Sequence, residues 1–277
     1  MSEKSARAAQ TAREYYNSEA ADSFYFQVWG GEHIHVGIYG VPGESVASAS
    51  RRTVQYMCAQ LNGLKAGTRL LDIGSGYGGA ARHLAATHGC HVTGLCISEV
   101  ENERHRAMNQ AQGLQHLIEV VDGNFEDMPF EDESFDIVWS QDAMLHSADR
   151  MRVFREVSRV LRTGGEFIFT DLMMADGCPE AAVKPILDRL LLESMASPEY
   201  YRFTASHCGF EELYQEDLTP HLTTHYARVL DDMEAIVARD ASALDAAYVE
   251  HARTGLQRWV DGGQAGHLAW GMFLYRR

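Results

Sequence analysis

The chain has 277 residues, 45% of them hydrophobic, which suits one large α/β domain with an inserted subdomain or two small domains. Its formal charge of −15 disfavours an electrostatic grip on nucleic acid or on an anionic membrane. No apolar run approaches the roughly 18 residues of a membrane span, residues 1–20 are too polar for a signal peptide, and the five cysteines lack Cys-x-x-Cys spacing. We therefore expect a cytoplasmic protein with reduced thiols.

The N-terminal segment is unusually rich in aromatic residues. Residues 4–20 have a helical pattern, and residues 24–39 follow with glycine steps that interrupt regular structure. We expect residues 1–45 to form a lid over a ligand site, and a hydrophobic flap packed on the core is the alternative. His33 and His35 resemble a metal-binding pair, but no third ligand follows at suitable spacing, so we expect no metal.

The strongest functional signal is the stretch Leu70-Leu-Asp-Ile-Gly-Ser-Gly-Tyr-Gly-Gly79. It predicts a strand, a tight turn and a helix N-terminus, in which Gly74 and Gly76 let a ligand approach the backbone. A dinucleotide site usually has an acidic residue at the end of the second strand, where this chain has Cys96. Asp72 can take a hydrogen bond from an ammonium or hydroxyl group, which favours S-adenosylmethionine, whose methionine end is zwitterionic.

Strands and helices alternate along the next hundred residues, and this alternation predicts a mostly parallel sheet covered on both faces. The expected helices are 45–61, 99–112 and 149–161, and the strands after the glycine-rich one are 91–95, 117–121, 135–139 and 165–172. Ligands of such sheets bind at the carboxyl ends of the strands. This rule selects Cys96 and Ile97 after the second strand, and Asn124 and Phe125 after the third, where an adenine can be held.

The block Ser140-Gln-Asp-Ala-Met-Leu-His146 follows the fourth strand and places an amide, a carboxylate and an imidazole at the same edge. Asp142 and His146 are four residues apart and share a face if the block is helical. Histidine is the side chain best suited to handling protons near neutral pH. A single histidine is more often structural than catalytic, and that alternative stays open.

The pattern changes beyond residue 171. The expected elements are helices at 180–196 and 198–208, a strand at 209–214, a largely helical stretch at 221–262 and a final strand at 268–275. We interpret residues 1–277 as a single α/β domain, Rossmann-like and doubly wound, with a mostly parallel sheet and an antiparallel C-terminal strand. Residues of about 174–208 and 218–264 are expected to form a helical cap over the site.

These blocks resemble class I S-adenosylmethionine-dependent methyltransferases, and more closely the sarcosine/dimethylglycine N-methyltransferases, which make glycine betaine. The closer resemblance is carried by Tyr15-Tyr-Asn-Ser-Glu19, Trp29-Gly-Gly-Glu32, Ser140-Gln-Asp-Ala143, Pro185-Ile-Leu-Asp-Arg189 and Trp259 through Trp270-Gly271. It implies S-adenosylmethionine as cofactor and a small-molecule amine as substrate. The expected cofactor contacts are Tyr25, Asp72, Gly74, Gly76, Cys96, Ile97, Asn124, Phe125 and Gln141.

The N-terminal and Ser140–His146 blocks also resemble phosphoethanolamine methyltransferases. In that family a tyrosine of the N-terminal region and a histidine after the fourth strand form a latch over the substrate, and by position these are Tyr16 and His146. Only Arg189 matches that family's phosphate-binding set, which weakens a phosphobase substrate. Because Cys96 stands where an acidic residue often binds the ribose, that contact falls to Ser98 or to backbone groups.

Methyl transfer from a sulfonium requires mainly alignment of nucleophile, carbon and sulfur, so no metal is needed. His146, oriented by Asp142 or held by Tyr16, is the candidate for accepting the amine proton directly or through water. Arg189 or Arg202 can bind the substrate carboxylate. Aromatic faces suit a methylammonium, and the candidates are Tyr25, Trp29, Tyr201, Tyr226 and Trp259.

Three other functions stay open. The first is a methyltransferase with another acceptor, either a phosphobase or a natural product methylated on nitrogen, oxygen or carbon. The second is an NAD-dependent oxidoreductase, and the third is a non-catalytic S-adenosylmethionine sensor. The sequence leaves the number of methyl groups transferred and the oligomeric state undetermined.

Overall fold

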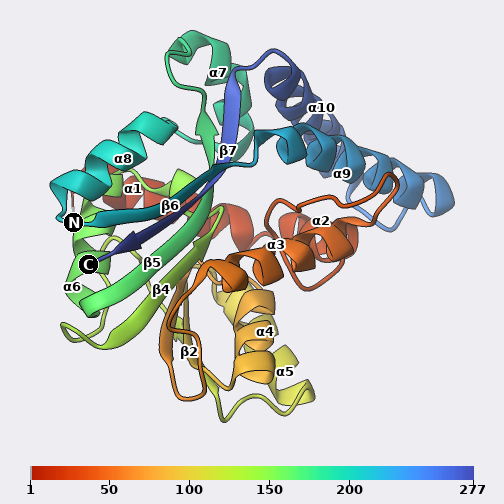
Figure 1. Cartoon of the computed structure of the whole chain (residues 1–277). Coiled ribbons are helices and arrows are strands. Elements are labelled where there is room, and N and C mark those ends of the chain that lie inside the picture. Colours follow the sequence, from red (N-terminus) through yellow and green to blue (C-terminus); the bar gives the residue numbers. More distant parts are fainter. Residues whose placement is uncertain (1) are drawn as a thin grey trace.

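A seven-stranded sheet forms the centre of the computed structural model, which describes residues 2–277 apart from the side chain of Arg189 (Figure 1). Its strands are β1 (Arg69–Ile73), β2 (His91–Cys96), β3 (Ile118–Asp122), β4 (Phe135–Gln141), β5 (Leu161–Met174), β6 (Glu211–Asp217) and β7 (Leu268–Arg276). They lie in the order β3-β2-β1-β4-β5-β7-β6, and β7 runs antiparallel to both of its neighbours while the pairs from β3 to β5 are parallel. This confirms the predicted Rossmann-like class.

Helices cover both faces of the sheet, as Figure 1 shows. One layer contains α3 (Val46–Gln60), α4 (Gly79–His88) and α5 (Glu99–Ala111), and the other contains α6 (Arg150–Val160) and α8 (Pro198–His207). Neighbouring residues of a strand point to opposite faces. Leu70 therefore packs in the cluster that includes α3 and α4, and Leu71 in the cluster that includes α6 and α8.

The predicted helix at 4–20 is two helices, α1 (Glu3–Tyr16) and α2 (Glu19–Val28). The Ser18 hydroxyl accepts a hydrogen bond from the Ala21 N–H, so it caps the second helix, and the chain turns between the two. The turn carries Tyr16, the last residue of α1, toward the carboxyl ends of the strands. The N-terminal segment thus begins with a helical pair and only becomes irregular after Trp29.

The region after β5 is divided differently from the prediction. The helix expected at 180–196 is α7 (Glu180–Leu187) followed by one short turn, η2 (Asp188–Leu190), which ends at Leu191 with a φ of 54°. The helix α8 packs against α6, β6 and β7, so it covers the sheet instead of belonging to a cap. The stretch predicted as largely helical is an antiparallel pair, α9 (Thr219–Arg239) and α10 (Ala246–Gln264), and α9 contacts α2 and α3.

Gly78, the N-cap residue of α4, combines two requirements for glycine. Its φ is +75°, and an added Cβ would lie 1.9 Å from Nε2 of the buried His105. We expect Gly78→Ala to lower the free energy of unfolding by about 2–5 kcal/mol, which is the sum of the cost of a left-handed backbone and the cost of an overpacked contact. Urea denaturation measures this loss.

Gly113 supplies the matched control for that prediction. It has a φ of +70°, and nothing lies within 4 Å of an added Cβ. Gly113→Ala should therefore cost only the backbone term, about 1–2 kcal/mol. Equal losses in the two variants would show that contact with His105 does not constrain the glycine-rich turn.

Candidate active site

A cavity lies at the carboxyl ends of β1, β2 and β4, and we call it the outer cavity. The N-terminal segment covers it, because α1 and residues 32–35 contribute to its lining. The predicted site residues that line it are Tyr16, Asp72, Gly74, Gly76, Cys96, Ile97, Asn124, Phe125, Gln141, Asp142 and His146. Side chains and glycines from five separate stretches of the sequence therefore meet here.

The glycine-rich turn keeps the outer cavity open. Gly74 has a φ of +77°, and its N–H donates to the Leu95 carbonyl at 2.7 Å, which joins the ends of β1 and β2. A Cβ on Gly74 would lie 2.3 Å from the Cβ of Ala143 and push the loop after β4 away. Burial raises the pKa of the Asp72 carboxyl at the end of β1 to about 7.

Three buried polar side-chain atoms of the outer cavity have no hydrogen-bond partner among the described residues. They are the donors Nε2 of Gln141 and Oγ of Ser75, and the carboxylate oxygen Oε2 of Glu126. The other amide atom of Gln141, Oε1, accepts a hydrogen bond from the Trp139 indole, so the free Nε2 is held in place. Buried donors without partners are rare in proteins, and they suit a site whose polar ligand completes the hydrogen bonding.

Glu101 is a lining residue that the sequence analysis did not select. Its buried carboxylate accepts a hydrogen bond from the Cys96 thiol at 3.1 Å, and burial raises its pKa to about 7. Ser98 instead caps α5 and donates to the Asn17 side chain. Glu101 thus places a buried carboxylate beside Cys96, at the end of the second strand. The sequence signal that could have indicated Glu101 is an acidic residue three positions after Ser98, the N-cap of α5.

A second and smaller cavity lies beside the outer one and shares part of its lining, and we call it the inner cavity. Among the predicted site residues it is lined by Tyr16, Tyr25, Trp29, Asp142, His146 and Tyr226. Tyr16, Ile34, His35, Asp142 and His146 line both cavities, so they form the boundary between them. Tyr25, expected at the cofactor, lines the inner cavity and not the outer one.

Tyr16 and His146 meet at that boundary. The Tyr16 hydroxyl lies 2.9 Å from Nε2 of His146, and the two rings are edge to face. Burial raises the pKa of Tyr16 well above its usual value and lowers the pKa of His146 to about 4. Both groups are therefore neutral at pH 7, with the phenol protonated and the imidazole uncharged.

Asp142 does not orient His146 in the way that their spacing suggested. The block after β4 is a short 3₁₀ turn, η1 (Met144–His146), preceded by Asp142 with a φ of 50°. The Asp142 carboxylate accepts hydrogen bonds from the Val36 N–H at 2.7 Å and from the Trp270 indole at 2.8 Å. It ties the N-terminal segment to β7, and burial raises its pKa to about 6.

Three of the predicted substrate residues have other surroundings. Tyr201 is buried between α8 and the sheet, where its hydroxyl donates to the Asp171 carboxylate, and Trp259 is buried in α10 and stacks on Tyr226. Neither lines the outer or the inner cavity. Arg202 forms a surface ion pair with Asp176 at 3.5 Å. The side chain of Arg189 lies outside the described part of the chain.

Among the described side chains, buried histidines line the inner cavity, and no lysine or arginine does. His35 and His225 line it, and His33, which lines the outer cavity, lies 3.2 Å from His35 between their ring nitrogens Nδ1 and Nε2. Burial lowers the pKa of His35 to about 4 and that of His225 to about 3, so both are neutral at pH 7. The sequence had indicated His33 and His35 only as a metal-like pair.

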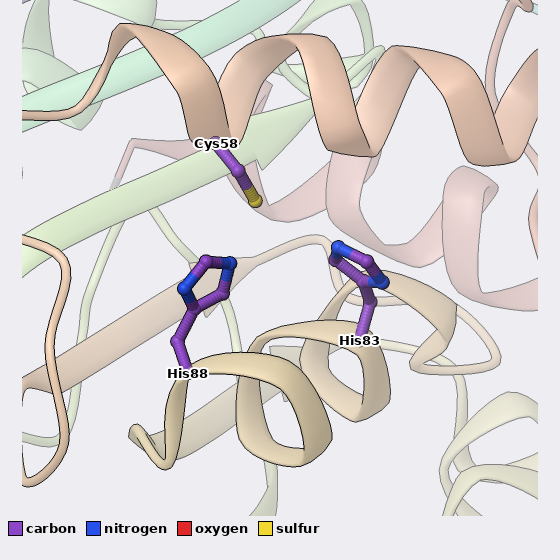
Figure 2. Close-up of side chains that lie close together, drawn as sticks. All are labelled: Cys58, His83 and His88. Atoms are coloured by element: carbon purple, nitrogen blue, oxygen red, sulfur yellow. The ribbon is translucent and has the colours of Figure 1, made fainter.

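A separate cluster of metal-ligand side chains lies between α3 and α4. Figure 2 shows His83 and His88 of α4 directed toward the thiol of Cys58 on α3. One ligand atom from each residue lies within 4.8 Å of the others. None of the three lines the outer or the inner cavity.

Comparisons with known proteins agree with this arrangement. The family model "Methyltransferase domain" matches residues 71–169. The sarcosine/dimethylglycine N-methyltransferase of Halorhodospira halochloris is 53% identical over 98% of this chain and 97% of its own length. The glycine/sarcosine/dimethylglycine N-methyltransferase of Actinopolyspora halophila is 51% identical over 97% of this chain, which spans 47% of that longer protein. A solved structure from Galdieria sulphuraria, provisionally described as a sarcosine dimethylglycine methyltransferase, has a TM-score of 0.89 and 39% identity and covers 95% of this chain and 98% of its own.

The sheet order, the glycine-rich turn and the cavity beside it define an S-adenosylmethionine-dependent methyltransferase. The full-length similarity is more specific. The chain belongs to the sarcosine/dimethylglycine N-methyltransferase family. No helix of residues 2–277 is both long and apolar enough to cross a membrane.

Proposed function

We propose that this enzyme methylates the nitrogen of sarcosine and dimethylglycine and that glycine betaine is its final product. The observation that carries this proposal is the Tyr16–His146 contact at the boundary of two buried cavities, of which the inner one is aromatic and small. The described residues that line the inner cavity include no lysine or arginine. A phosphorylated amine would need cations there, so this lining favours an amino acid.

The residues of the outer cavity fit S-adenosylmethionine. Asp72 suits the ammonium group and Glu101 the ribose hydroxyls, since each is a buried carboxylate. The free Nε2 of Gln141 can donate to the methionine carboxylate, and Asn124 and Phe125 can hold the adenine. When bound, the cofactor supplies a methyl group already activated by its sulfonium charge.

Tyr16 and His146 act on the amine nucleophile in this proposal. Dimethylglycine must lose the ammonium proton before its nitrogen lone pair can attack, and the new N–C bond then yields betaine with no further proton loss. A His146 with a pKa of about 4 is too weak a base to hold the proton of an aliphatic amine. The free tertiary amine has no N–H, and its lone pair must stay available for attack, so the pair positions the amine by packing against its alkyl groups. The lone pair then faces the methyl group, and the new N–C bond forms as the S–C bond of the sulfonium breaks.

The N-terminal segment, residues 1–45, acts as a lid in this proposal. Tyr16, Trp29 and His35 contribute to the cavity lining, and Asp142 fixes the segment through the Val36 N–H. A closed lid excludes water, which strengthens electrostatic contacts with a bound cation. Residues 218–264 complete the cover, since Tyr226 and His225 of α9 line the inner cavity.

Cofactor affinity should depend on pH through Asp72 and Glu101. The pKa of each is raised to about 7 by burial, so each carboxyl becomes protonated and neutral as the pH falls through 7. We expect the Kd of S-adenosylmethionine to rise on going from pH 8 to pH 6, by up to about tenfold per pH unit for each carboxyl. Isothermal titration calorimetry at several pH values measures it.

The control for this pH dependence is Glu119→Gln, which removes an exposed carboxyl of β3 and should leave the slope unchanged. Asp72→Asn and Glu101→Gln should each flatten it. A wild-type Kd that is constant between pH 6 and pH 8 would contradict the assignment of these two carboxylates to the cofactor.

The acceptor is tested by measuring release of S-adenosylhomocysteine with sarcosine, dimethylglycine, glycine and phosphoethanolamine offered separately. We expect turnover on sarcosine and dimethylglycine, and betaine as the product by mass spectrometry. Turnover on phosphoethanolamine alone would replace the proposed substrate by a phosphobase. Cofactor binding with no turnover on any of the four would refute the proposed acceptor class.

A further inference from the structure

The hydrogen bonds of His225 determine which of its ring nitrogens carries the proton. The Gly37 N–H donates to Nδ1 at 3.1 Å, so Nδ1 is an acceptor. The Tyr39 hydroxyl lies 3.1 Å from the same nitrogen. A neutral imidazole with an accepting Nδ1 has its proton on Nε2. That Nε2–H is buried, and it has no hydrogen-bond partner among residues 2–277.

Trp29 presents a second donor of the same kind. Its indole Nε1–H is buried and finds no acceptor in the described part of the chain. The ring centroids of Trp29 and His225 are 5.6 Å apart, and both side chains line the inner cavity. Each unpaired buried donor costs about 1–3 kcal/mol, so a ligand that accepts from both recovers this loss.

His35 also lines the inner cavity, and its hydrogen bonds are satisfied. His35 Nδ1 lies 3.1 Å from the Val36 carbonyl oxygen, which can only accept, so His35 carries its proton on Nδ1. Its Nε2 then accepts from Nδ1 of His33 at 3.2 Å. His35 therefore has no free N–H for a ligand, whereas Trp29 and His225 each have one.

We propose that Trp29 Nε1–H and His225 Nε2–H form a subsite that binds the carboxylate of the N-methylglycine substrate. This inference rests on the proposed function and names its specificity determinants. A carboxylate is the acceptor that neutral donors bind most strongly, because its charge assists each hydrogen bond. The site then selects amino acids over amino alcohols that have the same alkylated nitrogen.

Uncharged donors suit the release of the product as well. Betaine is a zwitterion with no net charge, and a buried guanidinium would hold its carboxylate tightly once water is excluded. The opposite end of the ligand meets the faces of Tyr16, Tyr25 and Tyr226. These aromatic faces stabilise a methylated ammonium without a carboxylate partner.

The test compares dimethylglycine with N,N-dimethylethanolamine, which has a hydroxyl group in place of the carboxylate. We expect Trp29→Phe and His225→Leu each to raise the KM for dimethylglycine by about 10- to 100-fold. The KM for dimethylethanolamine and for S-adenosylmethionine should change little. His225→Gln, whose amide keeps an acceptor and a donor, should restore much of the affinity.

Trp259→Phe is the matched control. Its indole N–H is also buried without a partner among the described residues, but it lines neither cavity, so its KM values should equal those of the wild type. Thermal denaturation shows whether His225→Leu still folds. If the wild type methylates dimethylglycine and folded Trp29→Phe and His225→Leu enzymes both keep its KM for dimethylglycine, the subsite is overturned. Failure of the wild type to methylate any N-methylglycine would instead overturn the proposed function.

A different observation supports a second site, the Cys58–His83–His88 cluster of Figure 2. We propose that these three side chains bind one Zn²⁺ ion, through the Cys58 sulfur and one nitrogen from each ring. Thiolate and imidazole are the ligands that zinc prefers, and three protein ligands leave a fourth position for water. Zinc bond lengths place such ligand atoms about 3.3–3.6 Å apart, so side chains now within 4.8 Å close around the ion by small rotations.

Zinc would join α3 to α4, the helix that starts at the glycine-rich turn. Zinc binds the thiolate form of cysteine, so binding releases the proton of the Cys58 thiol. Because the ion binds only the folded chain with this geometry, it should raise the melting temperature. The methyl-transfer activity of the zinc-free enzyme should be unaffected by loss of these ligands, which line neither cavity.

Chelator-treated enzyme titrated with Zn²⁺, and with Co²⁺ as a coloured probe, tests this site. We expect one ion per chain and a cobalt–thiolate absorption that disappears in Cys58→Ser and is lost or weakened in His83→Gln and His88→Gln. Cys178→Ser and His116→Gln are the controls and should bind as the wild type does. Absence of binding, or a cobalt–thiolate absorption that persists in Cys58→Ser, would overturn the proposal.

Discussion

Replacing His146 with alanine is expected to lower kcat for dimethylglycine about 100-fold, the loss that follows from misplacing a reacting group by about 1 Å. His146 lies at the boundary of the two cavities and contacts the Tyr16 hydroxyl at 2.9 Å. Removing the imidazole leaves the Tyr16 hydroxyl without this contact, and the amine is then no longer held in line with the methyl group. Release of S-adenosylhomocysteine at saturating substrates measures the effect.

The pH profile separates positioning from general-base catalysis. With a pKa of about 4, His146 is neutral above pH 6, so at saturating S-adenosylmethionine kcat/KM for dimethylglycine should rise with pH as the free amine becomes available. His146→Ala should lower this profile without changing its shape, and Tyr16→Phe should have a smaller effect in the same direction. His207→Ala, which alters a histidine of α8 outside both cavities, is the control. Recovery of the His146→Ala enzyme at high pH would instead indicate a general base.

Replacing Asp72 with asparagine is expected to raise the Kd of S-adenosylmethionine at pH 8 by about 10- to 100-fold, because it removes a charged hydrogen-bond acceptor. Calorimetric titration measures the loss of affinity. The same change should stabilise the empty enzyme. Burial raises the pKa of Asp72 from 3.8 to about 7, so the folded state binds more protons than the unfolded state between these values. The stability contributed by this group therefore falls as the pH rises through that window.

The two effects of Asp72→Asn have opposite signs, and this makes the prediction specific. At pH 8 the variant should melt at a higher temperature than the wild type when empty and gain less on addition of S-adenosylmethionine. At pH 4 the empty proteins should melt at similar temperatures. Asp136→Asn changes a partly exposed carboxyl near the start of β4 and is the control. A lower melting temperature with unchanged cofactor affinity would assign Asp72 a structural role only.

The sheet was predictable because its signals are local. Each of the strands β1 to β4 is a short run rich in apolar residues that ends in turn residues, helical patterns follow β1 and β2, and the glycine-rich turn fixes the start of α4. The break between α1 and α2 was also readable in principle, since Ser18 precedes the second helix at the N-cap position. The course of residues 180–208 was not, because packing of α8 on the sheet is decided by distant contacts with β6 and β7.

The cofactor side of the site was predictable for the same reason, since strand ends meet at one edge of the sheet. Glu101 escaped selection because it lies within a helix, where its burial depends on Cys96 and the N-terminal segment. The substrate side depends on which aromatic residues face a cavity. Composition does not distinguish Tyr201, which bonds to Asp171 beneath α8, from Tyr226, which lines the inner cavity.

The most direct test of the account is a single turnover. The enzyme is first loaded with one equivalent of S-adenosylmethionine that carries a labelled methyl group. It is then mixed with dimethylglycine, and S-adenosylhomocysteine and betaine are quantified by mass spectrometry. The account predicts one labelled betaine for each S-adenosylhomocysteine formed, and a rate about 100-fold lower in His146→Ala. S-adenosylhomocysteine without labelled betaine, or no reaction with dimethylglycine while the cofactor is bound, would contradict it.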